Sequence, residues 1–259
     1  VNINEIDIPF EKNSFSSDIT DNSGATNKNN LSSNNSNDNL LLKNQLCFIS
    51  YAYNEFTNIA YRKNMEDYHC IKQTLLKDSS ISYFGIFDGH SGKEVASYLS
   101  KNYHKILSSQ LEKIFSEDNK NNYSEIIVNA IKSSFEITDK EIIKNPKYSN
   151  NVGSTATIIL LYKDPKNNNI RNFICANVGD TKGILISKNS IVNITQEHKC
   201  TDIKEVERIK KSGGMVFNGR VFGTLMLTRS FGDKEMKNYG VIATPSYYEK
   251  TIEDNDYFI

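Results

Sequence analysis

Hydrophobic and polar positions divide the chain into a polar first stretch and a patterned remainder. Residues 1–45 are rich in Asn, Ser, Asp and Lys, and the run NNLSSNNSNDN has no hydrophobic periodicity that could bury a face. We predict a flexible tail for this stretch. From residue 46 to 259, segments typical of strands and of helices follow one another in blocks, which predicts one globular domain.

Short apolar runs rich in β-branched and aromatic residues predict the strands. The runs are CFISYAY (47–53), ISYFGIF (81–87), STATIILLY (154–162), NFICANV (172–178), GILISK (183–188) and IVNI (191–194). The third and fourth runs are joined by a loop that contains Asp-Pro and Asn, as a long hairpin would be. The last two runs predict a second hairpin.

Two long segments space their apolar residues near the 3.6-residue period of a helix. The first runs from about Lys93 to Phe115. The second opens with Asn122 as a candidate N-cap and has Glu125 three residues later, the pattern of a capping box. Because each helix has one apolar side, both must cover a sheet.

A shorter helix is predicted from about residue 202 to 212. Ile203, Val206 and Ile209 lie on one side of it, and Gly213 follows as a C-cap. Strands in runs, interrupted by blocks of helix, favour an α+β fold with an antiparallel sheet over a doubly wound parallel one.

Charge and composition exclude several classes of protein. Lys plus Arg and Asp plus Glu each number 31, and no dense basic block could follow a phosphate backbone, so we expect no nucleic-acid partner. No run approaches the roughly 18 apolar residues that a membrane span needs. The four cysteines form no C-x-x-C pair, which argues against a zinc knuckle or a redox dithiol. We therefore expect a monomeric intracellular protein of the cytoplasm or nucleus.

Acidic residues gather at the predicted strand ends. Glu66 and Asp67 precede Asp88 by about 21 residues, a separation that suits two adjacent strands and would bring the three carboxylates to one sheet end. Carboxylate and carbonyl oxygens are the ligands that Mg²⁺ and Mn²⁺ select. The alternative for Glu66 and Asp67 is a pair of solvated strand-end charges, and Asp88-Gly89 could equally be a plain turn.

Two further aspartates follow strand-like segments. Asp180 stands in ANVGDTKG and Asp233 in TRSFGD, and each taken alone is more typical of an ordinary turn. We interpret His104 and His198 as surface or capping groups rather than ligands. Several Asp-Gly or Gly-Asp turns that each end an apolar strand in one modest domain nevertheless favour a shared site.

In chain order, RKNMED, FGIFDGHSGKEVA, GSTATIILL, CANVGDTKGIL, EHKCTDIKEVERIKKSGGMV, GRVFGTLMLTRSFGD and VIATP resemble the successive motifs of the type 2C protein phosphatases (PPM family). These are metal-dependent serine/threonine phosphatases, and the resemblance covers residues 46–259. It implies a β-sandwich flanked by helix pairs, in four layers. It also implies phosphorylated proteins as substrates and two Mg²⁺ or Mn²⁺ ions at one end of the sandwich.

The resemblance implies the following metal ligands. Asp88 would bridge the two metals, while Glu66 and the carbonyl of Gly89 would complete one of them. Asp180 would help to hold a weaker third metal. Hydrolysis of a phosphate monoester is so slow without a catalyst that side chains alone do not suffice, and a metal pair supplies the larger share of the acceleration.

The resemblance also implies three catalytic roles. Arg62 would bind the substrate phosphate, Asp67 would orient waters on the metals, and His90 would protonate the departing alkoxide. No cysteine stands in a phosphate-binding loop, so a phosphocysteine mechanism has no support.

The sequence departs from the family pattern at three places. Ser91 replaces a glycine, GDTK with Lys182 replaces Gly-Asp-Ser-Arg, and Ile259 precedes the Asp-Gly and Asp-Asn motifs that complete one metal site in the family. We therefore expect a fragment of a longer enzyme that lacks its C-terminal segment. The alternative is a phosphatase-like binding module without catalytic activity.

Overall fold

The computed structural model describes residues 50–58, 60–77, 80–117, 122–164, 167–188 and 190–259. The predicted tail, residues 1–45, lies outside the described residues. The elements are, in chain order, β1 (Asp67–Lys72), β2 (Ser82–His90), α2 (Glu94–Glu117), α3 (Tyr123–Lys144), β3 (Gly153–Ser154), β4 (Ala156–Asp164), β5 (Asn167–Val178), β6 (Ile184–Ser187), β7 (Ser190–Asn193), α4 (Ile203–Lys211), β8 (Val216–Phe217), β9 (Arg220–Val221), β10 (Phe231–Gly232), α5 (Lys234–Lys237), β11 (Ser246–Thr251) and β12 (Tyr257–Phe258).

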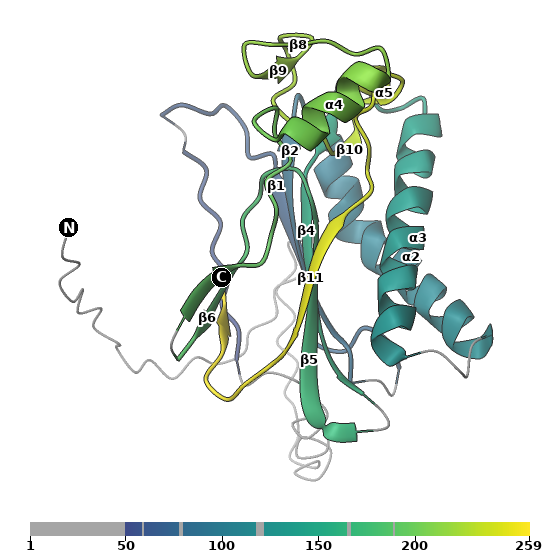
Figure 1. The fold of residues 1–259 in the computed structure, drawn as a ribbon, viewed down its shortest axis with the longest axis vertical. Helices are drawn as coiled ribbons and strands as arrows, with labels where there is room; N and C mark the ends of the chain where they lie inside the picture. Colours follow the sequence, from purple (N-terminus) through teal and green to yellow (C-terminus); the bar gives the residue numbers. More distant parts are fainter. Residues whose placement is uncertain (1–49, 59, 78–79, 118–121, 165–166, 189) are drawn as a thin grey trace, which may run out of the picture.

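The strands form one large antiparallel sheet and two small ones. In the large sheet β2 pairs with β1 on one side and with β4 on the other, and β5 and β11 continue from β4. The short strands β3 and β10 extend this sheet at the end of β2. A three-stranded sheet has the order β12-β6-β7, and β8 and β9 form a ribbon. Figure 1 shows β6 on one side of the large sheet and the helices α2 and α3 on the other.

Two apolar cores follow from the alternation of side chains along the strands. On β4, Ala156, Ile158 and Leu160 belong to the core that α2 and α3 cover, while Ile159 and Leu161 pack towards the three-stranded sheet. The fully buried side chains of the helices include Leu99, Tyr103, Leu107, Leu111, Ile127, Ile131 and Phe135. The large sheet is therefore covered on one face by a helix pair and on the other by a sheet.

This arrangement confirms the predicted α+β fold with antiparallel sheets and a covering helix pair. In the described part of the chain, α2 and α3 are the only helix pair of this length, so three of the four predicted layers are present. The N-cap prediction is also confirmed, because the side chain of Asn122 accepts a hydrogen bond from the backbone N–H of Ser124. No helix among the described residues is both long and apolar enough to cross a membrane.

Two local predictions are wrong. Residues 50–53 of the predicted first strand have no regular structure, and the ring of Tyr51 instead lies edge-on to Phe84 at 6.0 Å. On α4, Ile203 is 74% exposed, whereas Glu205 and Ile209, one turn apart, are buried. The helix is turned in this way because Glu205 has charged partners in the interior.

Candidate functional site

The pairing of β1 with β2 builds the acidic end of the large sheet. The two strands are antiparallel, and their register sets Asp67 directly opposite Asp88. Directly opposed residues of an antiparallel pair point to the same face. The predicted meeting of these carboxylates is therefore confirmed, and it follows from a strand connection of the expected length.

Glu66 and Gly89 lie in close backbone contact beside this pair. The N–H of Gly89 donates a hydrogen bond to the carbonyl of Glu66 at 3.2 Å. A Cβ on residue 89 would stand 2.6 Å from the same oxygen, so only glycine permits the approach. The predicted ligands Glu66 and Gly89 are thus neighbours of Asp88 at the same sheet end.

The backbone of Asp88 is fixed by the segment before β4. Thr155 donates its backbone N–H to the carbonyl of Asp88 at 2.9 Å and accepts the N–H of Asp88 on its hydroxyl at 3.2 Å. The same hydroxyl lies 2.7 Å from that of Thr181, which follows Asp180 directly. Thr155 therefore connects the two acidic turns to each other.

The surroundings of Asp88 disfavour its ionised form. Loss of hydration raises the pKa of Asp88 to about 6, and the charge and hydrogen bond of Asp67 and the charge of Asp180 act in the same direction, while His90 opposes them. Carboxylates in such proximity need a proton or a cation between them. A bound positive charge would therefore stabilise the carboxylates at this end of the sheet.

His90 follows these groups and is held by a fourth aspartate. Its Nε2 lies 2.9 Å from both carboxylate oxygens of Asp233, whose side chain is buried. Burial disfavours the imidazolium form of His90, but the hydrogen bond and charge of Asp233, with Asp88 and Glu66, outweigh it and raise the pKa of His90. His90 is therefore favoured as a proton carrier near neutral pH.

Glycine at position 153 makes the His90–Asp233 contact possible. A Cβ on Gly153 would lie 2.5 Å from Nε2 of His90 and would also overlap the Asp233 carboxylate. Asp233 itself has a left-handed backbone, with φ and ψ both 48°, and accepts a hydrogen bond from the Ser230 hydroxyl at 2.5 Å. From the sequence, Asp233 was interpreted as more typical of an ordinary Gly-Asp turn, and its contact with His90 was missed.

Asp180 lies near enough to Asp88 to raise the pKa of Asp88, and it forms an ion pair with a lysine side chain. The ammonium of Lys199 is 3.1 Å from Asp180 and 2.8 Å from Glu197. Glu197 also pairs with Lys182 at 3.0 Å. Asp180 therefore belongs to a chain of alternating charges at the edge of the site.

The prediction that His198 is a surface or capping group is wrong, because His198 is fully buried. Its Nδ1 accepts the N–H of Gly179 at 3.1 Å, so Nε2 carries the proton and donates to the Ser246 hydroxyl at 2.9 Å. Burial lowers the pKa of His198 to about 4, which keeps the ring neutral. The side chain holds the turn that presents Asp180.

His104 was also predicted as a surface or capping group, and the structure places it differently. Its Nδ1 lies 3.5 Å from the thiol of Cys70, at the contact of α2 with β1. Burial lowers the pKa of His104 to about 4, helped by the charges of Lys72 and Lys105. His104 is therefore a neutral packing residue of the helix layer.

Arg62 is exposed on the segment before β1, four residues before Glu66. Its backbone N–H is bonded to the carbonyl of Asn58 at 2.8 Å. Among the described residues, the guanidinium forms no ion pair with the carboxylates of the site. Arg62 is thus near the acidic end in sequence, but the structure does not bring it into contact with the other predicted residues.

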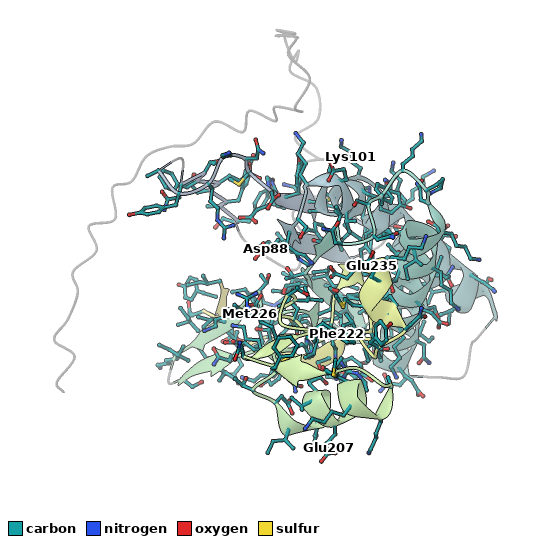
Figure 2. The ribbon with its side chains drawn as sticks, turned by 90° about the horizontal axis from the view of Figure 1, so that it is seen from above. Asp88, Lys101, Glu207, Phe222, Met226 and Glu235 are labelled. Atoms are coloured by element: carbon teal, nitrogen blue, oxygen red, sulfur yellow. The ribbon has the colours of Figure 1, made fainter. Side chains whose placement is uncertain are left out.

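The donor chemistry of this end fits a hard divalent cation. The available groups are carboxylates and a carbonyl, all oxygen ligands, and the pKa of Asp88 is raised by burial first and then by the charges of Asp67 and Asp180. Within the described residues, no three His, Cys, Asp or Glu side chains converge as a ready-made metal site. The structure therefore supports the type of ligand but displays no coordination geometry. Figure 2 looks down on this end of the molecule, with Asp88 and Glu235 of α5 labelled.

Comparison with known proteins agrees with this fold. Residues 51–259 match the family model described as protein phosphatase 2C, and the chain belongs to this family, whose members are generally metal-dependent. "Probable protein phosphatase 2C 11" of Arabidopsis thaliana is 33% identical over 214 residues, which are 81% of this chain and 52% of that protein. "Probable protein phosphatase 2C 52" of Oryza sativa is 31% identical over 219 residues, covering 82% and 40%.

A solved structure supports the fold independently. The serine-threonine phosphatase 2C from Toxoplasma gondii superposes with a TM-score of 0.60 at 20% identity, over 75% of this chain and 72% of the other. The chain spans about half the length of the two plant relatives that it matches.

Proposed function

We propose that the protein containing this chain hydrolyses phosphoserine and phosphothreonine in proteins, with Mg²⁺ or Mn²⁺ at two sites and a weaker third ion at Asp180. The observation that carries the proposal is the β1–β2 register, which pairs Asp67 with Asp88, two residues before β2 ends at His90. Membership of the protein phosphatase 2C family gives the reaction class.

Glu66, Asp88 and the carbonyl of Gly89 would hold the first cation, and Asp88 would be shared with the second. When bound, such a cation pair makes water acidic enough to attack near neutral pH and places positive charge at the phosphoryl oxygens. Asp67, opposite Asp88, would accept hydrogen bonds from water on that side. Arg62 would meet the phosphate from the exposed segment before β1.

His90 would complete the reaction by protonating the serine or threonine oxygen as it leaves. Because Nε2 would donate to Asp233, Nδ1 would be the atom that delivers a proton to the leaving group. The raised pKa keeps that proton on the ring near neutral pH, and Asp233 stabilises the charged form. The arrangement corresponds to a general acid oriented by a carboxylate.

The metal requirement is tested with Asp88→Asn. In the full-length protein, we expect phosphopeptide hydrolysis only with Mg²⁺ or Mn²⁺, and nearly none in the variant, because asparagine removes the negative charge and one of the two ligand oxygens. Titration calorimetry should show weaker Mn²⁺ binding by the variant. Undiminished hydrolysis in excess chelator, or by Asp88→Asn, would refute the proposal.

The acid role is tested with His90→Gln. We expect turnover of a phosphoserine peptide to fall by roughly 10²–10⁴-fold, while an aryl phosphate is hardly affected because its leaving group needs little protonation. An equal loss on both substrates would make His90 a structural residue.

A further inference from the structure

We propose that Asp139 of α3 and Lys237 of α5 are positioning residues, which hold the turn from Ser230 to Asp233 so that Asp233 meets His90. This inference rests on the proposed function, in which His90 is the general acid. It assigns a role in the reaction to a buried ion pair that contacts none of the predicted metal ligands.

Asp139 and Lys237 bind the backbone on both sides of Phe231, the first residue of β10. Asp139 accepts the N–H of Gly232 on Oδ1 at 2.9 Å and the ammonium of Lys237 on Oδ2 at 2.8 Å. Lys237 also donates to the carbonyl of Ser230 at 2.7 Å. One ion pair therefore binds the backbone both before and after Phe231, immediately ahead of Asp233.

The pair is buried at a place where the helix pattern favours an apolar residue. Asp139 is 8% exposed, and α3 otherwise buries Ile131, Phe135 and Ile142 along its core side. Burial raises the pKa of Asp139, while Lys237 and the N–H of Gly232 counteract this. Replacement of a buried ion pair by apolar side chains is often neutral or stabilising, so stability alone is a weak reason for the pair.

The geometry of the turn supplies a stronger reason. Gly232 and Asp233 both have positive φ, at 74° and 48°, which ordinary residues avoid. A backbone in this conformation needs fixed partners to keep one arrangement. With the carbonyl of Ser230 and the N–H of Gly232 both bonded, the Asp233 carboxylate is directed at Nε2 of His90.

The same helix offers a matched control. Glu136 and Lys140 form an ion pair at 2.5 Å one turn away, but both side chains are more than 60% exposed. Glu136→Gln removes one carboxylate charge from α3, as Asp139→Leu does, without touching the turn. Surface pairs of this kind contribute little to stability.

The experiment compares Lys237→Met, the double variant Asp139→Leu with Lys237→Met, and the control Glu136→Gln in the full-length protein. Thermal unfolding is measured first. Turnover is then measured on a phosphoserine peptide and on p-nitrophenyl phosphate, and amide hydrogen exchange is followed at residues 230–233 and along α3.

We expect the double variant to recover thermal stability relative to Lys237→Met but not phosphopeptide turnover. Phosphopeptide hydrolysis should fall by about tenfold to a hundredfold in both, with a smaller loss on the aryl ester, because a displacement near 1 Å has effects of this size. Exchange at Gly232 should increase while α3 stays protected. Glu136→Gln should resemble the wild type throughout.

Equal losses on both substrates, or unchanged exchange at Gly232, overturn the inference. Recovery of turnover together with stability in the double variant also overturns it, because the pair would then act through stability alone. A wild-type protein that hydrolyses neither substrate refutes the proposed function instead. In that case hydrogen exchange still decides whether the pair holds the turn.

Discussion

Replacement of Glu205 by glutamine removes the charge at the centre of the ion network that joins α4 to the segment leading into the site. The carboxylate of Glu205 is 3% exposed and accepts bonds from Arg229 at 2.7 Å, Arg208 at 2.6 Å and the Thr228 hydroxyl at 2.8 Å. A glutamine has the same shape, but its NH₂ group would face donors where an oxygen now accepts.

The expected loss of stability in Glu205→Gln follows from the lowered pKa of Glu205. Burial opposes the charged form of Glu205, but the hydrogen bonds from Arg229, Arg208 and Thr228 outweigh it and lower the pKa from 4.5 to about 2. The difference corresponds to roughly 3 kcal/mol at neutral pH, the lower end of the 3–5 kcal/mol typical for breaking a buried pair. In a domain of this size we expect a fall in Tm of roughly 6–12 °C.

The contribution of Glu205 to the free energy of unfolding decreases as the pH falls. Because the folded pKa of Glu205 lies below the unfolded value, the unfolded chain binds the extra proton as pH falls. The contribution is therefore fully present above about pH 5 and is lost between 4.5 and about 2. Glu205→Gln should lack this component of the acid destabilisation.

Thermal unfolding followed by circular dichroism, at pH 7 and at intervals down to pH 3, measures both effects. Glu136→Gln on the exposed pair of α3 is the control, and its Tm should stay within about 1 °C of the wild type. A Glu205→Gln protein with the Tm of the wild type, or with the same slope between pH 5 and pH 3, would refute the reasoning.

Two further substitutions test how the site is assembled. Gly153→Ala places a methyl group between His90 and Asp233, so we expect phosphopeptide turnover to drop by about a hundredfold with an unchanged circular dichroism spectrum; normal turnover would show that their contact is dispensable. His198→Leu leaves the N–H of Gly179 without its acceptor, which should destabilise the protein by about 1–3 kcal/mol in urea unfolding. An unchanged unfolding midpoint would contradict that prediction.

Much of the site could be predicted because its residues lie on adjacent strands joined by a short connection. The sequence pattern set Asp67 and Asp88 on neighbouring strand ends, and the register confirms it. Gly89 and His90 were predicted from the same motif, FGIFDGHSGKEVA. The predicted tail of residues 1–45, the monomeric state and the place in the cell stay predictions.

Two of the failures, at α4 and at His198, share a physical cause, because a polar side chain has buried partners far away in the chain. Ile203 was predicted to share one apolar side of α4 with Val206 and Ile209, but the ion pair of Glu205 with Arg229 decides which side faces inward. His198 was predicted to be a surface or capping group, whereas its buried ring has a hydrogen-bond partner on each nitrogen. Hydrophobic periodicity predicts the burial of apolar side chains. It does not predict the burial of polar side chains whose hydrogen bonds are satisfied inside the protein.

The residues proposed to take part in the reaction and the residues proposed to orient them differ in how far apart they lie in the sequence. The acidic ends of β1 and β2 are close in sequence, whereas the bond from Gly232 to Asp139 joins residues 93 positions apart. A short motif therefore specifies the reacting groups but not the contacts that orient Asp233 towards His90. Because the rate of a reaction depends on the orientation of the reacting groups at the scale of 1 Å, the proposed role predicts that substitutions at Asp139 or Lys237 change activity while every motif stays intact.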